Sequence, residues 1–260
     1  MHQSNVVYLE RFFEEKYGKV LCYPMCDLTE LKNRIDELNR LGVETLEFIG
    51  EKNVANMPVL GKGCVGIVVA AYTRRGKVAL KIRRMDADRS EMQHEAEMLK
   101  KANTVKVGPK LLGVSENFLL MEFIKGPLLF NWISALRGRG RGTKSRVRKV
   151  LRDILEQCWK LDQIGLDHGE LSKAPKHIII DEEGKPHIVD FETASINRRV
   201  SNVTSICQYL FIGSEVAKVI KTRLSYIDRN VLIESLKKYK RRRSRRDFES
   251  ILKKCNLHNV

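Results

Sequence analysis

The sequence lacks any apolar run long enough to cross a membrane. No stretch of about 18 or more consecutive apolar residues occurs among its 260 residues. The first residues, Met1 to Asn5, also lack the basic and then apolar parts of a secretion signal. We therefore expect no membrane span and no leader peptide.

Closely spaced cysteine pairs are also scarce. The six cysteines are scattered, mostly within apolar segments, which is typical of reduced thiols in a cytosol and not of a disulfide framework. Cys22 and Cys26 form one Cys-x-x-x-Cys pair, and no second pair completes a zinc site. We expect a soluble, cytoplasmic protein.

Acidic residues are absent from two stretches that are rich in basic ones. Residues 137–152 and residues 237–246 each contain eight lysines or arginines and no aspartate or glutamate. Outside these two basic clusters, 32 basic residues face 32 acidic ones, so the clusters account for the whole formal net charge of +16. The rest of the chain is neutral.

Charge concentrated in this way predicts a polyanionic partner. The segment 137–142, Arg-Gly-Arg-Gly-Arg-Gly, resembles the flexible arginine-glycine segments of RNA-binding proteins. Neither cluster has the interleaved aromatic residues of a base-stacking platform, so binding would be to phosphates and would depend steeply on salt. We favour an RNA-containing or ribosome-associated partner; an acidic protein and a solvated face without a partner are the alternatives.

A glycine-rich motif lies near residue 60. Residues 61–68 read Gly-Lys-Gly-Cys-Val-Gly-Ile-Val, which has the form G-x-G-x-x-G-x-V. A dinucleotide-binding turn would open a helix at this point, whereas here β-branched residues continue the chain as a strand. A turn at 74–76 then leads into Lys-Val-Ala-Leu-Lys-Ile at 77–82. The pattern predicts a strand, a glycine loop, a second strand, a turn and a third strand that carries Lys81.

An apolar hairpin is predicted from residue 178 onward. The triplets that begin at Ile178 and His187 flank a polar turn that contains Gly184. Such a hairpin brings the residue before its first strand, His177, close to the residue after its second strand, Asp190. This arrangement suits a magnesium ion that bridges nucleotide phosphates, since Mg²⁺ takes oxygen ligands. An ordinary surface hairpin that ends in an aspartate is the alternative.

Two helices and a strand complete the central part of the chain. A helix is predicted over residues 86–102, where apolar residues recur at spacings of three and four. Residues 117–124 follow as an apolar strand. A longer helix, with its apolar stripe over 147–158, then leads into residues 167–170, which read Asp-His-Gly-Glu.

The order of these features resembles that of the protein kinases. In that superfamily a glycine loop, a strand lysine, a helix glutamate, a hinge strand, a catalytic loop and a metal-binding aspartate follow one another, and residues 57–195 contain a counterpart of each. The resemblance is to the small atypical kinases, the RIO family and the archaeal kinase of the KEOPS complex, and in particular to archaeal predicted serine/threonine protein kinases of that lineage. It implies an α+β, two-lobed protein-kinase-like fold with a small antiparallel sheet in the N-lobe and a reduced helical C-lobe.

The resemblance implies ATP and Mg²⁺ as cofactors. It makes Lys81 the lysine that holds the phosphates and Glu95 its partner, with Glu91 and Glu97 as rivals for that pairing. The implied catalytic residues are Lys81, Glu170 and Asp190, and the implied metal ligands are Asp190 and His177. The implied nucleotide-binding residues are Gly61, Lys62, Gly63, Cys64, Val65, Gly66, Val68, Ala79, Lys81, Glu95, Met121, Glu122 and Phe123.

Three residues depart from the kinase pattern. Glu170 replaces an aspartate, which moves the carboxylate about one methylene outward in a reaction that depends on positioning. His177 replaces a metal-binding asparagine, and neutral imidazole is a poor Mg²⁺ ligand, so contact with phosphate or a single-metal site are alternatives. Glu192 replaces a flexible glycine and either adds a metal ligand or locks the loop. Lys173 and Lys176 either neutralise phosphate charge or are solvated loop residues.

We expect three regions in the chain. Residues 1–50 form a helical extension with helices over 6–17 and 28–41, residues 51–125 form the kinase N-lobe, and residues 126–260 form a reduced C-lobe with a basic C-terminal segment. Within that C-lobe three short helices are expected after Asp190, at 203–211, 214–224 and 229–238.

Two classes of function follow from the resemblance. The first is an ATP-dependent phosphotransferase, an atypical serine/threonine kinase acting on a protein substrate. The second is an ATPase switch or nucleotide-binding scaffold within an RNA-protein assembly, which the three departures favour. A small-molecule kinase on the same fold is a third alternative, and the sequence names neither the acceptor nor the oligomeric state.

Overall fold

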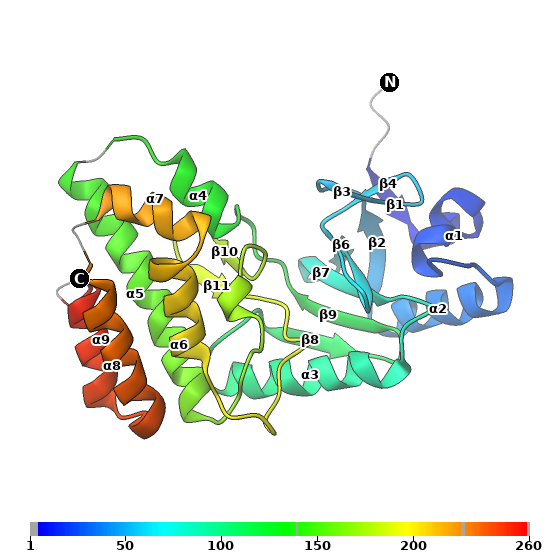
Figure 1. Cartoon of the computed structure of the whole chain (residues 1–260). Coiled ribbons are helices and arrows are strands. Elements are labelled where there is room, and N and C mark those ends of the chain that lie inside the picture. The colour runs from blue at the N-terminus through cyan, green and yellow to red at the C-terminus, as the bar shows by residue number, and fades with distance from the viewer. Residues whose placement is uncertain (1–4, 139, 225–226, 259–260) are drawn as a thin grey trace. The chain divides into compact units, whose positions relative to one another are not determined.

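The computed structural model describes residues 5–138, 140–224 and 227–258, which form two compact units. The N-terminal unit comprises Met1–Lys100 and Pro109–Phe123, and the C-terminal unit comprises Lys101–Gly108 and Ile124–Val260. Figure 1 traces the chain from the strand-rich first unit to the helical second unit. The fold is α+β, and its separation into an antiparallel sheet and a helical part is compatible with the expected two-lobed architecture.

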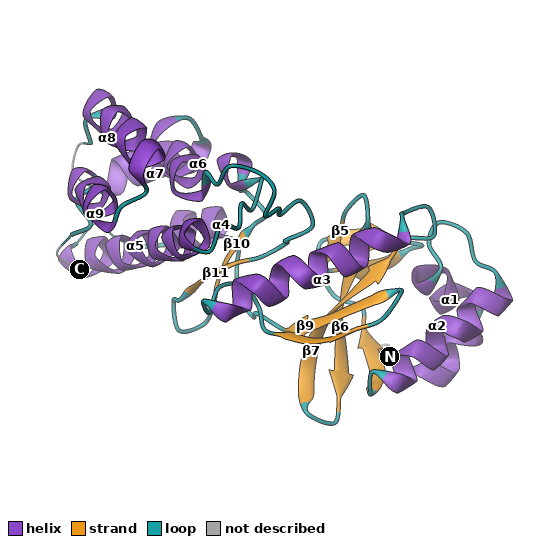
Figure 2. Cartoon of the chain, turned by 90° about the horizontal axis from the view of Figure 1, so that it is seen from below, coloured by secondary structure: helices purple, strands orange, loops and turns teal. Residues whose placement is uncertain are grey.

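An antiparallel sheet organises the N-terminal unit. In the described part of the chain it has seven strands in the order β1-β2-β6-β7-β9-β8, and β5 also pairs with β6. The helix α3 (Arg89–Thr104) lies along one face of this sheet (Figure 2). A separate hairpin consists of β3 (Lys52–Val54) and β4 (Met57–Val59). The strands of the main sheet are β1 (Val6–Tyr8), β2 (Val43–Glu47), β5 (Gly61–Lys62), β6 (Gly66–Thr73), β7 (Gly76–Arg83), β8 (Leu111–Val114) and β9 (Phe118–Glu122).

The first fifty residues are not the purely helical extension that the sequence suggested. The predicted helix over 6–17 is wrong at its start, because residues 6–8 form β1 and pair with β2. A short 3₁₀ helix (Leu9–Phe13) and α1 (Glu15–Leu21) follow. The β-branched pair Val6-Val7 favours a strand, and Val7 is buried in the core of the unit. Two strands of this segment therefore extend the sheet that carries the glycine motif.

The second predicted helix of this region is confirmed as α2 (Leu28–Arg40). Asp27 caps it, since its carboxylate accepts a 2.9 Å hydrogen bond from the N–H of Thr29. The fully buried Arg34 of α2 donates to the carbonyl oxygens of Leu21 and Arg83 and to the side chain of Asn117. This one guanidinium ties α2 to the end of β7, two residues after Lys81.

The C-terminal unit is mainly helical. The predicted hairpin is present as β10 (Ile178–Ile180) and β11 (Pro186–Ile188), and the side chain of Gln157 on the long helix α5 donates a 2.7 Å hydrogen bond to Pro186 O. The other elements are α4 (Leu129–Ala135), α5 (Arg141–Gln163), the 3₁₀ turn η2 (Leu171–Lys173), α6 (Asn202–Cys207), the π-helical η3 (Gln208–Ile212), α7 (Glu215–Arg223), α8 (Arg229–Arg242) and α9 (Arg245–Lys254).

The segment that enters this unit is held closely against the hairpin. A Cβ built on Gly126 would lie 1.9 Å from Ile180 O, so no larger residue fits there. The N–H of Ile180 donates a 2.9 Å hydrogen bond to Pro127 O. The chain therefore enters the C-terminal unit along β10, the strand that follows His177.

Helix α9 was not predicted from the sequence. The three helices expected after Asp190 correspond to α6 with η3, α7 and α8. Helix α9 follows them, begins at a Ser244 cap and buries Phe248, Ile251 and Leu252. Among the described helices none is by itself long and apolar enough to span a membrane, and one bent pair, Asn202–Ile212 with Glu215–Arg223 at 67°, reaches that length and composition together.

Candidate functional site

The glycine motif forms the turn between β5 and β6. Lys62 pairs with Ile67 across this hairpin, and the N–H of Gly63 donates a 2.8 Å hydrogen bond to Gly66 O. Cys64 lies exposed at the turn. The predicted nucleotide-binding positions Gly61, Lys62, Gly63, Cys64, Val65, Gly66 and Val68 all belong to this hairpin.

Lys81 forms a buried ion pair next to that turn. Its ammonium lies 2.6 Å from the Glu95 carboxylate, and the two side chains are only 5% and 2% exposed. The rival glutamates, Glu91 and Glu97, are exposed on α3. A buried ion pair gains little net stability because desolvation offsets the attraction, so it is better explained by a function that needs a positioned lysine.

The third glycine of the motif makes room for Lys81. A Cβ built on Gly66 would lie 3.0 Å from two carbon atoms of the Lys81 side chain and 3.0 Å from Ile82 O. Such contacts are tighter than ordinary van der Waals packing. The absence of a side chain at Gly66 therefore leaves the space that the Lys81 side chain needs.

The predicted hinge residues lie at the end of β9. Met121 pairs with Ala79 of β7, so these two predicted nucleotide-binding residues are neighbours. The N–H of Glu122 donates a 2.9 Å hydrogen bond to Lys110 O. Phe123 ends the N-terminal unit, and the Lys77 ammonium lies 4.7 Å from the centre of its ring.

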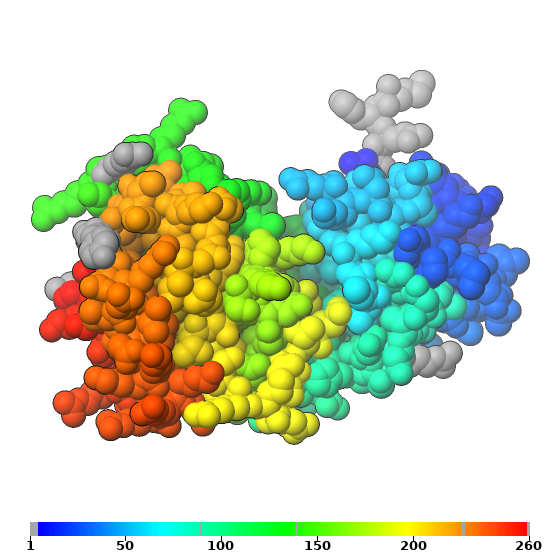
Figure 3. Space-filling model, in the orientation of Figure 1, coloured from blue at the N-terminus to red at the C-terminus, as the bar shows by residue number. Residues whose placement is uncertain are grey.

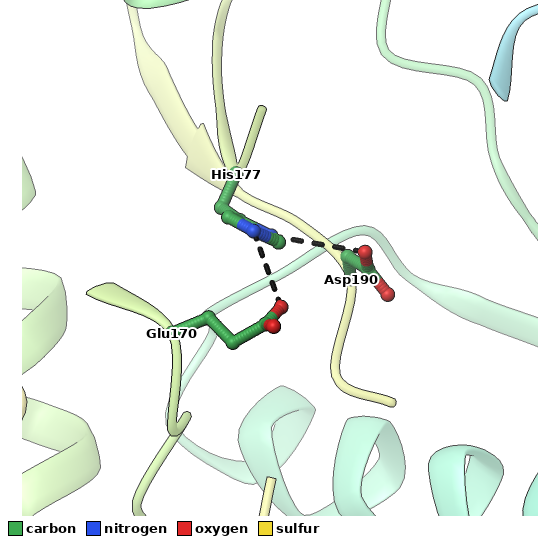
Figure 4. Close-up of side chains that lie close together, drawn as sticks. All are labelled: Glu170, His177 and Asp190. Atoms are coloured by element: carbon green, nitrogen blue, oxygen red, sulfur yellow. Dashed lines mark ion pairs between the residues drawn. The ribbon is translucent and has the colours of Figure 1, made fainter. Parts of the chain in front are cut away.

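In the C-terminal unit the β10–β11 hairpin brings His177 and Asp190 together, as its pattern predicted. His177 Nδ1 lies 3.7 Å from Asp190 Oδ2, and His177 Nε2 lies 3.2 Å from Glu170 Oε2 (Figure 4). The imidazole is buried, whereas the two carboxylates are 44% and 42% exposed. We call these three residues the carboxylate–imidazole cluster. Its donor atoms suit a divalent cation. The two carboxylates offer oxygens, which Mg²⁺ accepts, and the imidazole offers a nitrogen, which Mg²⁺ does not favour.

Unusual backbone conformations shape this cluster. Asp190 has φ +69°, a left-handed conformation that asparagine and aspartate tolerate better than most residues. Gly169 has φ +92°, and a Cβ there would lie 2.9 Å from Thr193 Oγ1 and 3.0 Å from Thr193 O. A glycine at position 169 is therefore required by the chain segment that packs on it.

His168 lies beneath the cluster and is fully buried. Its Nε2–H donates a 3.1 Å hydrogen bond to Val189 O, one residue before Asp190. Its ring centre lies 5.1 Å from that of Phe191 and 5.5 Å from that of His177. Burial, together with the nearby His177, lowers the pKa of His168 to about 4. The neutral imidazole of His168 thus contacts the ring of His177 and holds the backbone just before Asp190.

A network around Asp162 holds the loop that carries Glu170, and sequence reasoning missed it. The Asn202 side chain donates to Asp162 Oδ1 at 2.8 Å and accepts from the N–H of His168 at 2.8 Å. Tyr239 Oη donates to Asp162 Oδ2 at 2.8 Å. Burial raises the pKa of the Asp162 carboxyl, against the lowering effect of these hydrogen bonds. A signal in the sequence was the acidic residue Asp162 at a position that continues the apolar stripe of α5.

Asp167 forms a second anchor for the same loop. Its carboxylate accepts hydrogen bonds from Arg198 Nε at 3.1 Å and from the N–H of Ser201 at 2.9 Å. Its backbone exchanges two hydrogen bonds with Ser195, at 2.9 and 2.8 Å. These hydrogen bonds join the segment just before Glu170 to the segment that follows Asp190.

The remaining residues of the predicted site are more open. Lys173 and Lys176 are exposed in the loop between Glu170 and His177. Glu192 is half-buried two residues after Asp190.

The two basic clusters both lie in the C-terminal unit. The first covers the chain before α5 and the first half of that helix, with Arg139 outside the described residues; its green side chains project into solvent in Figure 3. The second runs from the end of α8 into α9, and its Arg245 pairs with Glu156 on α5 at 2.7 Å. Exposed basic residues in these clusters are Arg137, Arg141, Lys144, Arg146, Lys149, Lys237, Lys238, Lys240, Arg241, Arg242, Arg245 and Arg246.

Two known proteins are similar to parts of this chain. The uncharacterized protein MJ1211 of Methanocaldococcus jannaschii is 35% identical over 123 residues, which are 46% of this chain and 99% of MJ1211. The serine/threonine-protein kinase YabT of Bacillus subtilis is 38% identical over 88 residues, which are 29% of this chain and 25% of YabT. The chain thus matches only a quarter of that kinase. No family model matches the chain.

Proposed function

This chain belongs to the same family as the Methanocaldococcus jannaschii protein MJ1211, and we propose that it is an ATP-dependent phosphotransferase. The proposed type is an atypical, RIO-like serine/threonine protein kinase with a protein substrate. The partial similarity to the kinase YabT supports the class of activity. The observation that carries the proposal is the buried Lys81–Glu95 pair beside a glycine turn.

The N-terminal unit would bind the nucleotide. Glu95 accepts one N–H of the Lys81 ammonium and fixes its direction, and such an ammonium has three N–H donors in all. Its fixed positive charge suits the phosphates of ATP, since preorganised charge costs no rearrangement during transfer. The open glycine turn would let backbone N–H groups approach the same phosphates.

The C-terminal unit would act on the acceptor. The Glu170 carboxylate, 44% exposed, would orient the acceptor hydroxyl and accept its proton as the oxygen attacks the γ-phosphorus. A divalent cation held by Asp190 would neutralise the charge on the phosphates. The anchors at Asp162 and Asp167 hold the Glu170 loop in place, which matters because this reaction depends mainly on positioning.

One contact favours a second candidate, an ATPase switch or nucleotide-binding scaffold. Glu170 Oε2 lies 3.2 Å from His177 Nε2, so the carboxylate has a partner that competes with an acceptor hydroxyl. Water, being smaller than a protein hydroxyl group, would then be the acceptor. The ATPase switch predicts free phosphate as the product, and the nucleotide-binding scaffold predicts neither product.

The test is incubation of the purified chain with a divalent cation and γ-phosphate-labelled ATP. Lys81→Met should reduce turnover by about 100-fold or more, the size expected when a preorganised charge is lost. Lys32→Met removes an exposed lysine on α2 and is the matched control. Label on protein supports the kinase, free phosphate alone supports the switch, and equal turnover in the Lys81 and Lys32 variants contradicts both.

We further propose that the basic clusters bind the phosphates of an RNA-containing partner. Seven exposed lysines and arginines of the second cluster follow one another on the end of α8 and the start of α9. Such a surface attracts polyanions through counterion release. The clusters are separate in sequence from the proposed nucleotide-binding and catalytic residues, so the partner would locate the enzyme without taking part in the chemistry.

A further inference from the structure

The imidazole of His177 faces a carboxylate from each of its two nitrogens. Nε2 lies 3.2 Å from Glu170 Oε2, and Nδ1 lies 3.7 Å from Asp190 Oδ2. Figure 4 shows one ion pair from the ring to each of the two acidic side chains. The residue is only 6% exposed, so water cannot readily replace either contact.

Within the described part of the chain, Nδ1 of this buried ring has no hydrogen-bond partner. A neutral imidazole has one N–H and one lone pair. Because a carboxylate lies opposite each nitrogen, the nitrogen that carries the lone pair in a neutral ring must face the lone pairs of a carboxylate. A buried polar atom in this position is costly unless a cation satisfies it.

The spacing of the donors fits a single metal ion. With bonds of about 2.1 Å, two ligands of one ion lie about 3.0 Å apart at a right angle and about 4.2 Å apart when opposite. A metal ion binds only one nitrogen of an imidazole, and the pair formed by His177 Nδ1 and Asp190 Oδ2, 3.7 Å apart, falls between these limits. One donor atom from each of Glu170, His177 and Asp190 lies within 4.8 Å of the other two, and both carboxylates are exposed enough to adjust.

The donor set discriminates between metals. Mg²⁺ demands oxygen ligands and retains its waters, whereas imidazole is a good ligand for first-row transition metals. An asparagine here would offer an oxygen, but this chain has a histidine. We propose that the carboxylate–imidazole cluster binds a divalent first-row transition-metal ion in preference to Mg²⁺. This inference rests on the proposed function only for the use of the ion, because binding itself needs no nucleotide.

The test uses Mn²⁺ as the probe, with the full chain and no nucleotide. Bound Mn²⁺ is counted by loss of the free-ion electron paramagnetic resonance signal, in competition with Mg²⁺. Spin-echo modulation of the bound ion then reports any directly coordinated nitrogen. The wild-type protein should bind Mn²⁺ at least about tenfold more tightly than His177→Asn, since even residues that only orient a ligand are worth about that much.

Two further variants keep the result interpretable. Glu170→Gln removes a charge from a half-exposed side chain, leaves the buried ring in place, and should weaken Mn²⁺ binding while nitrogen coupling persists. His187→Asn removes another imidazole of the same hairpin, which pairs with Asp181 at 2.7 Å, and should leave Mn²⁺ affinity unchanged. These two separate loss of a ligand from loss of folding and from binding elsewhere.

The outcomes separate this inference from the proposed function. Nitrogen coupling that disappears in His177→Asn supports the site. Equal Mn²⁺ affinity in wild type and His177→Asn, or Mg²⁺ binding as tight as Mn²⁺ binding, overturns it. ATP turnover measured on the same samples is independent: turnover without Mn²⁺ preference leaves the kinase proposal standing, and Mn²⁺ binding without turnover leaves the metal site standing.

Discussion

The hydroxyl of Tyr239 on α8 donates a 2.8 Å hydrogen bond to the buried carboxylate of Asp162 on α5, 77 residues earlier in the chain. The same carboxylate accepts from Asn202, which in turn accepts from the N–H of His168. A helix near the end of the chain thus stabilises the loop that carries Glu170.

Tyr239→Phe should lower the free energy of unfolding of the C-terminal unit by about 1.5–3 kcal/mol, the usual contribution of a hydrogen bond to a charged group. Both tryptophans of the chain, Trp132 and Trp159, lie in that unit, so their fluorescence in urea reports its unfolding. Tyr8→Phe, at a site that is 63% exposed, is the control and should cost little. Equal effects of the two variants would mean that the Tyr239 hydroxyl contributes nothing.

His168 should make stability depend on pH. Its folded-state pKa of about 4 lies below the usual 6.5, so the unfolded chain takes up the proton first as pH falls. The stability is complete above pH 6.5 and is lost toward pH 4, by about 2 kcal/mol between pH 7.5 and pH 5. The difference in unfolding free energy between wild type and His168→Gln should shrink by that amount. A difference that stays constant over this range would contradict the buried neutral imidazole.

Gly169→Ala should destabilise the C-terminal unit more than Gly165→Ala. Both glycines have positive φ, +92° and +72°, and an alanine at either costs about 1 kcal/mol through its backbone. Only at Gly169 would the Cβ collide, with Thr193 and with Arg198; at Gly165 nothing lies within 4 Å. We expect an additional loss of about 1–3 kcal/mol at Gly169, measured by urea unfolding, and similar losses at both sites would show that the Thr193 segment moves aside.

Neutralising the second basic cluster should weaken RNA binding and reduce its dependence on salt. A variant with four of its exposed residues changed to glutamine should lower the slope of log K against log salt by about 3 for single-stranded RNA. Basal ATP turnover should not change. The residues are Lys238, Lys240, Arg241 and Arg242, and the control changes four exposed residues of the N-terminal unit, Lys32, Arg40, Lys52 and Arg74. Equal weakening by both variants would show that only net charge matters.

Local signals in the sequence predicted the elements around the candidate site. The β10–β11 hairpin followed from two short apolar segments around a glycine turn, and α2 from its apolar stripe. The choice of Glu95 over Glu91 and Glu97 did not follow, because all three lie on one charged helix. Only packing against the sheet decides which of them is buried.

Long-range contacts account for what the sequence did not predict. Strand β1 forms only by pairing with β2, some forty residues away. A short Val-Val-Tyr segment next to a helical pattern does not predict that pairing. Helix α9 was missed because a basic run precedes its apolar stripe of Phe248, Ile251 and Leu252. The Ser244 cap was a usable signal of its start. The network from Asp162 to Asn202 and Tyr239 joins three segments that share no local motif.

The pairing of β1 with β2 and of β2 with β6 determines how far the chain can be shortened. Strand β6 begins at the last glycine of the motif, and β2 covers one of its edges. A fragment trimmed to the kinase-like motifs, from residue 57 onward, would lack β1 and β2 and would expose the backbone of β6 as a free edge. Free edges recruit strands from other molecules, so such a fragment should aggregate even though every motif residue is present.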